Sequence, residues 1–277
     1  MPKLTDSITL TQDNLVSNNA NNNVLRLKFP TSVTYKNKCI GFNNGSIYYS
    51  WANVGVSYNN QFFQYIFTDG VTYNVTVPAG NYSIVDLSNY LQAVMTTNNH
   101  YMLDSKGNKV FFISWAPNLT YYRTTFVCTQ VVVPSGGSNP NALTLAKTPQ
   151  LLISNNGFST LLGISAGTYP SSQAVAGPSY NFNGTLVPAI SPVTLVNINC
   201  SIAENRTNQN SKQIYQFQPQ LSFGNQLSLV PSYPLYYKII DGTYQSIEIS
   251  LTDNKNVALP IQDTTAISIT LILTDID

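Results

Sequence analysis

The segment Gly163-Ile164-Ser165-Ala166-Gly167 matches the G-x-S-x-G pattern of a nucleophile elbow, in which a serine on a sharp turn attacks an ester or amide carbonyl. That chemistry needs a buried strand before the serine, a helix after it, and a histidine later in the chain as general base. Here Tyr169 and Pro170 follow, which do not open a helix, and the only histidine, His100, precedes the serine. We interpret the motif as a glycine-rich turn, with a hydrolase using Ser165 as one alternative.

The acidic residues suggest two further kinds of site, a glycosidase pair and a calcium site. Glycoside hydrolysis needs two carboxyl groups that converge on one bond. The chain has only two glutamates, Glu204 and Glu248, and Glu248 falls on the polar face of a predicted strand. The spacing of the C-terminal aspartates matches no EF-hand loop, so we assign them to turns and solvent. These aspartates are Asp253, Asp263, Asp275 and Asp277.

The cysteines and the histidine offer no cluster of metal ligands. Cys39, Cys128 and Cys200 are odd in number, far apart and outside any CxxC pattern, so the sequence predicts buried or idle thiols in a reducing compartment. His100 follows a predicted helix, where an imidazole meets the C-terminal dipole or faces solvent. The sequence therefore predicts no catalytic, cofactor-binding or metal-binding residue.

Composition limits the class of partner. Only 9% of the residues are charged and the formal net charge is +1, so no strong field directs the protein to nucleic acid or to an anionic membrane. The basic residues near the start, Lys3, Arg26, Lys28, Lys36 and Lys38, are too sparse for a nucleic-acid footprint. No signal peptide and no membrane-spanning apolar run is visible. Neutral surfaces rich in Asn, Ser, Thr and Tyr suit wide contacts with proteins or with sugars.

Alternation of apolar and polar residues with period two dominates the chain and predicts antiparallel strands. The clearest runs are 25–29, 71–77, 246–251 and 267–273, and further β-rich runs occupy 39–51, 61–68, 109–115, 120–133, 193–200, 213–219 and 235–240. One amphipathic helix is predicted after Ser83, which serves as its cap with Asp86 at N3. A helical turn is expected at 158–162, and surface loops at 134–140 and 164–183. The fold class is all-β, a sandwich or a barrel.

Several stretches resemble the minor capsid, or penton, proteins of virophages and Polinton-like viruses. Residues 78–91 resemble the family's segment of glycine, aromatic residue and capped helix, and 157–163 with 167–170 resemble its mid-chain turn. The C-terminal region resembles the end of a viral jelly-roll capsid protein through residues 233–253 (YPLYYKIIDGTYQSIEISLTD), 258–261 and the last strand.

The resemblance implies a single jelly-roll antiparallel sandwich with one short amphipathic helix. It implies a vertex protein of which five copies plug each icosahedral five-fold position, beside a double jelly-roll major capsid protein, in a virion assembled inside the host cell. No catalytic residue comes with this role. We expect a flexible N-terminal arm over 1–23 and a jelly roll over 24–277. Because a minimal jelly roll needs fewer residues, we expect an insertion or long loops within 99–180.

A carbohydrate-binding sandwich, such as an attachment or lectin-like protein, is the main alternative. The abundance of Tyr and Asn favours it, and it predicts exposed aromatic rings in loops, such as Tyr169 and Tyr180. Receptor or glycan binding is also compatible with a vertex protein.

Overall fold

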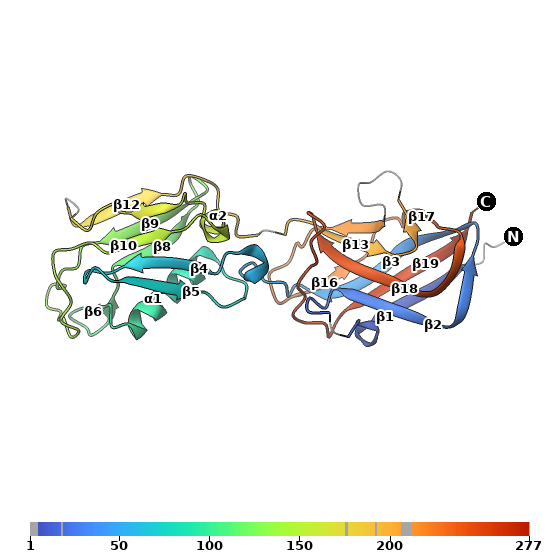
Figure 1. The fold of residues 1–277 in the computed structure, drawn as a ribbon, viewed down its shortest axis with the longest axis horizontal. Coiled ribbons are helices and arrows are strands. Elements are labelled where there is room, and N and C mark those ends of the chain that lie inside the picture. Colours follow the sequence, from blue (N-terminus) through green and yellow to red (C-terminus); the bar gives the residue numbers. More distant parts are fainter. Residues whose placement is uncertain (1–4, 18, 175–176, 192, 206–211, 277) are drawn as a thin grey trace. The chain divides into compact units, whose positions relative to one another are not determined.

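The chain forms two compact units, each with its own hydrophobic core (Figure 1). The computed structural model describes residues 5–17, 19–174, 177–191, 193–205 and 212–276. Unit 1 combines the two ends of the chain, 1–52 and 193–277, and unit 2 is the intervening segment 53–192. Unit 2 is therefore an insertion in a single loop of unit 1.

Strand pairing in unit 1 is nested, because the first strand pairs with the last and each later strand pairs with one further in from the end. The four antiparallel pairs are β1 (Thr5–Thr11) with β19 (Ser268–Asp275), β2 (Val24–Tyr35) with β18 (Gly242–Asp253), β3 (Lys38–Tyr48) with β16 (Gln226–Leu229), and β13 (Val196–Cys200) with β15 (Gln213–Phe217). Such a folded-over ribbon of eight strands is the wiring of a jelly roll.

The ribbon closes into two sheets, ordered β1-β19-β3-β16 and β15-β13-β18-β2. Two short strands, β17 (Tyr236–Ile239) and β14 (Ala203–Glu204), extend the first sheet beside the other half of β3. The predicted jelly-roll sandwich is thus confirmed for unit 1. Unit 2 leaves the ribbon between its third strand, β3, and its fourth, β13.

The core of unit 1 follows from the alternation in its long strands. Ile247, Ile249 and Leu251 of β18 and Leu271 and Leu273 of β19 are buried, whereas the residues between them are only partly buried. Burying each such side chain contributes about 1.5–3 kcal/mol. A one-residue slip in register would expose the whole set, so the pattern fixes the pairing.

The start of the chain differs from the prediction of a flexible arm over 1–23. Thr5–Thr11 is strand β1, paired along its whole length with β19, and Leu10 is fully buried. A 3-10 turn, η1 (Gln12–Asn14), follows, and Leu15 bridges to Leu25. The prediction is wrong for these residues because the edge of β19 supplies a partner that local composition does not reveal. Residues 1–4 and 18 lie outside the described residues.

Unit 2 contains two main sheets, a two-stranded ribbon and two α-helices. One sheet is ordered β11 (Gly167–Tyr169), β10 (Gln150–Ile153), β4 (Phe62–Ile66), β5 (Thr72–Thr76), and the other β12 (Ser179–Asn183), β9 (Arg123–Thr129), β8 (Ile113–Asn118). The ribbon pairs β6 (Met102–Leu103) with β7 (Lys109–Val110), and the helices are α1 (Ile84–Thr97), α2 (Gly157–Leu162) and the 3-10 turn η2 (Val56–Tyr58).

Aromatic side chains join the layers of unit 2. The Phe63 ring of β4 stacks on Phe158 of α2 at 4.5 Å between centroids and meets Trp115 of β8 edge to face at 5.6 Å. Trp115 Nε1 donates a hydrogen bond to the carbonyl of Ile84, which ties α1 to this sheet. Tyr169 of β11 and Phe182 of β12 stack on each other and join the end strands of the two sheets. Unit 2 is thus a second β-rich domain with one covering helix.

Helix α1 begins as predicted. The Ser83 hydroxyl accepts a hydrogen bond from the backbone N–H of Asp86, and the Asp86 carboxylate accepts from the backbone N–H of Ser83. This reciprocal pair satisfies two helix N-terminal donors.

The inserted unit, 53–192, is wider than the expected range 99–180. The predicted surface loop 164–183 contains β11 and β12. Each of these strands has five residues or fewer, too short for alternation to identify, and each is held by pairing with another strand, β11 with β10 and β12 with β9.

Candidate functional site

The elbow-like motif lies between a helix and a strand in the order opposite to that of a nucleophile elbow. Helix α2 precedes Ser165 and strand β11 follows it, whereas the elbow needs strand, turn, then helix. The Ser165 hydroxyl hydrogen-bonds the Thr185 hydroxyl at 2.9 Å, and Gly163 adopts a left-handed conformation that ends α2. The segment is therefore a helix C-cap and turn, as we interpreted it.

His100 lies elsewhere in unit 2 and is buried, not exposed at a helix end. Its Nδ1 is 2.9 Å from the Tyr65 hydroxyl, and its ring stacks on Phe67 at 3.9 Å between centroids. Asn98 donates a hydrogen bond to the Tyr65 oxygen, so the Tyr65 O–H is free to donate to an unprotonated Nδ1. Burial lowers the pKa of His100 below its ordinary value, partly opposed by the Asp69 carboxylate. His100 is a packed core residue with a satisfied hydrogen bond.

The acidic residues are separated into independent local roles. Glu248 pairs with Arg26 across β18 and β2, and Asp275 pairs with Lys38. Asp253 accepts hydrogen bonds from the backbone N–H groups of Lys255 and Val257. Asp263 accepts from the backbone N–H and the hydroxyl of Thr265. Glu204 lies in β14, and Asp277 lies outside the described residues.

Metal-ligating side chains do not cluster. Among the described residues, no three His, Cys, Asp or Glu side chains gather as a metal site would require.

None of the three cysteines forms a disulfide bond. Burial raises the pKa of Cys128 to about 12 and that of Cys200 to about 11, so both remain protonated at neutral pH. Cys39 is only partly buried. Buried, protonated thiols are poor nucleophiles, which agrees with the interpretation from sequence.

The aromatic rings named for sugar stacking are part of the packing of unit 2. Tyr169 and Tyr180 lie in β11 and β12, both are partly buried, and both contact Phe182. The prediction that they are exposed loop residues is wrong. Exposed rings occur instead at Tyr121 and Tyr122, in the turn between β8 and β9, where no sequence periodicity distinguishes them.

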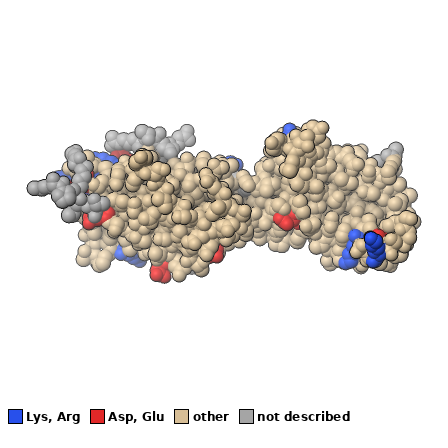
Figure 2. Space-filling view, turned by 180° about the vertical axis from the view of Figure 1, so that it is seen from behind, with Lys and Arg blue, Asp and Glu red and all other residues tan. Residues whose placement is uncertain are grey.

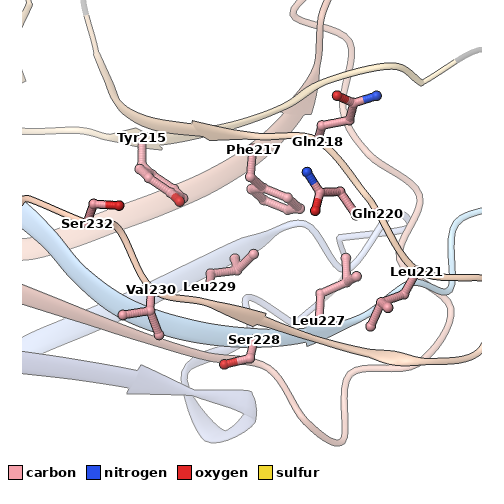
Figure 3. Close-up of a pocket in the computed structure, with 10 residues that line it drawn as sticks. All are labelled: Tyr215, Phe217, Gln218, Gln220, Leu221, Leu227, Ser228, Leu229, Val230 and Ser232. Carbon is pink, nitrogen blue, oxygen red and sulfur yellow. The ribbon is translucent and has the colours of Figure 1, made fainter.

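A groove of about 600 Å³ lies in unit 1 where β15 and β16 form the edges of the two sheets (Figure 3). Tyr215 and Phe217 point from β15 toward Leu227 and Leu229 of β16. We call this surface the β15–β16 seam; its lining residues are Tyr215, Phe217, Gln218, Gln220, Leu221, Leu227, Ser228, Leu229, Val230 and Ser232. The lining carries amides, hydroxyls and apolar groups but no charge.

The seam has the volume of a ligand site, but its polar groups do not converge as they would around a small molecule. Gln218, Gln220 and Ser232 stand on its rim and are exposed. Burial raises the pKa of Tyr215, and its ring stacks on Phe42 at 4.3 Å, so the phenol is neutral and one ring face is already covered. An uncharged groove whose polar groups do not converge fits another protein better than a metabolite.

Charged side chains are sparse on the described surface in general. Figure 2 shows scattered Lys, Arg, Asp and Glu residues on one face of the molecule, separated by wide uncharged areas. No helix among the described residues is long and apolar enough to cross a membrane.

Comparison with known proteins gives matches in structure alone. No protein-family model matches the chain, and no curated protein matches it in sequence. The crystal structure of the mavirus penton protein is similar over 98% of this chain and 97% of its own, at 7% identity and a TM-score of 0.45. A chain in the 3.5 Å cryo-EM structure of the Sputnik virophage is similar over 99% and 98%, at 10% identity and a TM-score of 0.40. The nested strand order of unit 1 stands independently of these scores.

Proposed function

We propose that this chain is a structural protein of a viral capsid, the vertex protein that occupies icosahedral five-fold positions as a homopentamer. The observation that carries the proposal is the jelly-roll strand order of unit 1, joined to the sequence resemblance to virophage and Polinton-like penton proteins. This is an argument from fold and family resemblance, since capsid proteins have no catalytic constellation to recognise.

Three properties of the described residues support a structural role. The residue types that could do chemistry are dispersed, because Ser165 and His100 have different hydrogen-bond partners and the acids sit in separate turns or ion pairs. Both sheets of unit 1 are antiparallel and wrap a single core. The uncharged surface suits permanent contacts, because interface cores are depleted of charge.

The proposed neighbour in the shell is a double jelly-roll major capsid protein, and the proposed location is the capsid vertex after assembly inside the host cell. The low net charge gives no support for specific nucleic-acid binding.

The test is the mass of the purified chain in solution, by light scattering coupled to size exclusion. The monomer mass is 30.5 kDa, so a five-membered ring is well resolved from a monomer or dimer. A pentamer is the expected result, and co-assembly with the major capsid protein should place it at the vertices in electron micrographs. A chain that stays monomeric at high concentration and does not enter shells would overturn the proposal.

A further inference from the structure

Two strand edges lie together at the β15–β16 seam. Among the described strands, β15 pairs only with β13, and β16 pairs only with β3, along the half of β3 that β17 does not pair with. Open edges present unpaired backbone groups, and proteins commonly blunt them with lysine or another inward-pointing charge. No charged residue occurs between Lys212 and Lys238, a stretch that includes both strands and the loop joining them. The seam therefore lacks charge protection.

The opposite edges of the same sandwich are different. Strand β2 is an edge of its sheet and carries Arg26 and Lys28, with Arg26 paired to Glu248 on β18. The edge strands β1 and β2 thus carry exposed charged residues, whereas the edge strands β15 and β16 carry none. This asymmetry indicates that the seam is the side built to be covered.

Large apolar side chains are exposed in the uncharged stretch that contains the seam. Six of them are exposed by 42% to 83%, more than single scattered residues on an ordinary surface. They are Leu221 and Val230, which line the seam, and Phe223, Tyr233, Leu235 and Tyr236. Covering them would remove apolar area from water and would give the open edges hydrogen-bonding partners.

Charge complementarity selects the occupant. A charged partner would lose hydration at the seam and gain no counter-charge, which excludes a nucleic-acid backbone or an anionic membrane. The partner must be a neutral protein surface with amide and hydroxyl groups. This chain, with 9% charged residues, provides such a surface itself.

We propose that the β15–β16 seam is the surface through which one copy of this chain contacts the next. The inference rests on the proposed function and deepens it by assigning the contact. In a ring of rotational symmetry higher than two, each contact joins two different surfaces, so the seam of one copy meets another face of its neighbour. The buried centre of the contact is Leu221 and Val230, with the Gln218 and Gln220 amides at its rim.

The test compares two matched substitutions in unit 1 by light scattering across a dilution series. Gln220→Lys adds one charge at the exposed rim of the seam, and Gln245→Lys adds the same charge at an exposed site on β18 near the opposite edge. Gln220→Lys should weaken self-association about tenfold or more, and Gln245→Lys should change it little. Leu221→Ser, which removes an exposed apolar group, should also weaken it.

At concentrations low enough for every protein to be monomeric, each variant should keep the wild-type thermal unfolding curve, because none of the three substituted side chains is buried. If rings form only on the major capsid protein, incorporation into shells is the readout for the same variants. Wild-type rings that resist both Gln220→Lys and Leu221→Ser would overturn the seam assignment and leave the proposed function standing. A wild type that forms no rings in either assay would overturn both.

Discussion

Unit 1 and unit 2 are both β-rich, but different kinds of side chain fill their cores. Unit 1 relies on long strands, twelve residues in β2 and in β18, with a core dominated by Ile, Leu and Val. Unit 2 uses shorter strands and a core organised around Phe63, Trp115 and Phe158. The two units therefore fix their packing in different ways. In unit 1 the burial pattern along the long strands sets the register of strand pairing. In unit 2 the packing depends on contacts between aromatic rings and on hydrogen bonds such as that of Trp115.

Buried amides add a second contrast. In unit 2 the Asn53 side chain donates hydrogen bonds to the carbonyls of Tyr82 and Ile190 and accepts one from the backbone N–H of Tyr82. Asn53 is near the start of the inserted unit and Ile190 near its end. One buried side chain thus holds the two ends of the insertion, which must lie close together to join β3 and β13.

The largest expected effect comes from removing the central ring of unit 2. Trp115→Ala should lower the free energy of unfolding of unit 2 by about 3–5 kcal/mol, because it leaves a large cavity and removes the hydrogen bond to Ile84. The chain has two tryptophans, and Trp51 belongs to the core of unit 1. In this variant, fluorescence reports unit 1 alone and should show an unchanged transition, while circular dichroism should show an earlier one.

The counterpart in unit 1 is Leu271→Ala, a buried aliphatic truncation on β19. It should shift the Trp51 fluorescence transition instead. If either substitution moved both transitions equally, the two units would unfold as one, and the comparison between two independent cores would be wrong.

The next effect concerns the amide that closes the insertion. Asn53→Ala should destabilise unit 2 by about 2–3 kcal/mol, because the backbone carbonyls of Tyr82 and Ile190 lose their hydrogen-bond donor. Denaturant titration followed by Trp115 fluorescence, in a Trp51→Phe background, measures the change. Asn44→Ala, at an exposed position on β3 of unit 1, is the matched control and should change this transition little.

The same contrast explains what could be predicted from the sequence. The long strands of unit 1, such as β18 and β19, are predictable from the sequence. Each buries one face, so apolar and polar residues alternate along it. Strand β1 was missed because its order comes from β19, more than two hundred residues away, and the neighbouring Asn-rich tract suggested an arm. The limits of unit 2 were missed because Asn53 and Ile190 meet only in the folded chain.

The candidate site divides in the same manner. The absence of an elbow at Ser165 was inferred from the residues that follow it and from the position of His100. The one sequence signal of the β15–β16 seam is the lack of charge between Lys212 and Lys238, and residue alternation does not reveal it. Period-two analysis does not report which strands become edges, because that depends on the order of strands in each sheet.

A smaller and pH-dependent effect should separate the units further. His100 has a pKa lowered by burial in the folded chain, so the folded state favours the neutral imidazole. The stability that unit 2 gains from holding His100 neutral is fully present above the unfolded-state pKa of 6.5. It is lost as the pH falls below 6.5 toward the lowered pKa of His100 in the folded chain. In that window unit 2 should lose up to about 1.4 kcal/mol per pH unit.

The titratable groups that face His100 are Tyr65, Tyr73 and Asp69. Burial raises the pKa of Tyr65 to about 12, and the hydrogen bond to Asp69 does the same for Tyr73, so neither phenol titrates in the acid range. His100→Gln should remove this loss of unit 2 stability below pH 6.5, measured by Trp115 fluorescence. Unit 1 contains no histidine and should lack this slope in both proteins. A wild-type unit 2 whose stability is flat over this range would contradict the assignment of a buried neutral imidazole.

The smallest effect tests whether unit 2 depends on its helix as a local element. Ser83→Ala removes the cap of α1 and should cost about 1 kcal/mol of unit 2 stability, because the N–H of Asp86 loses its acceptor. Ser83→Thr should restore most of it, since a threonine hydroxyl accepts the same hydrogen bond and can donate to the Asp86 carboxylate as Ser83 does. If Ser83→Ala instead destabilised unit 2 as much as Trp115→Ala, the helix would be the organising element of this unit, ahead of the ring cluster that it covers.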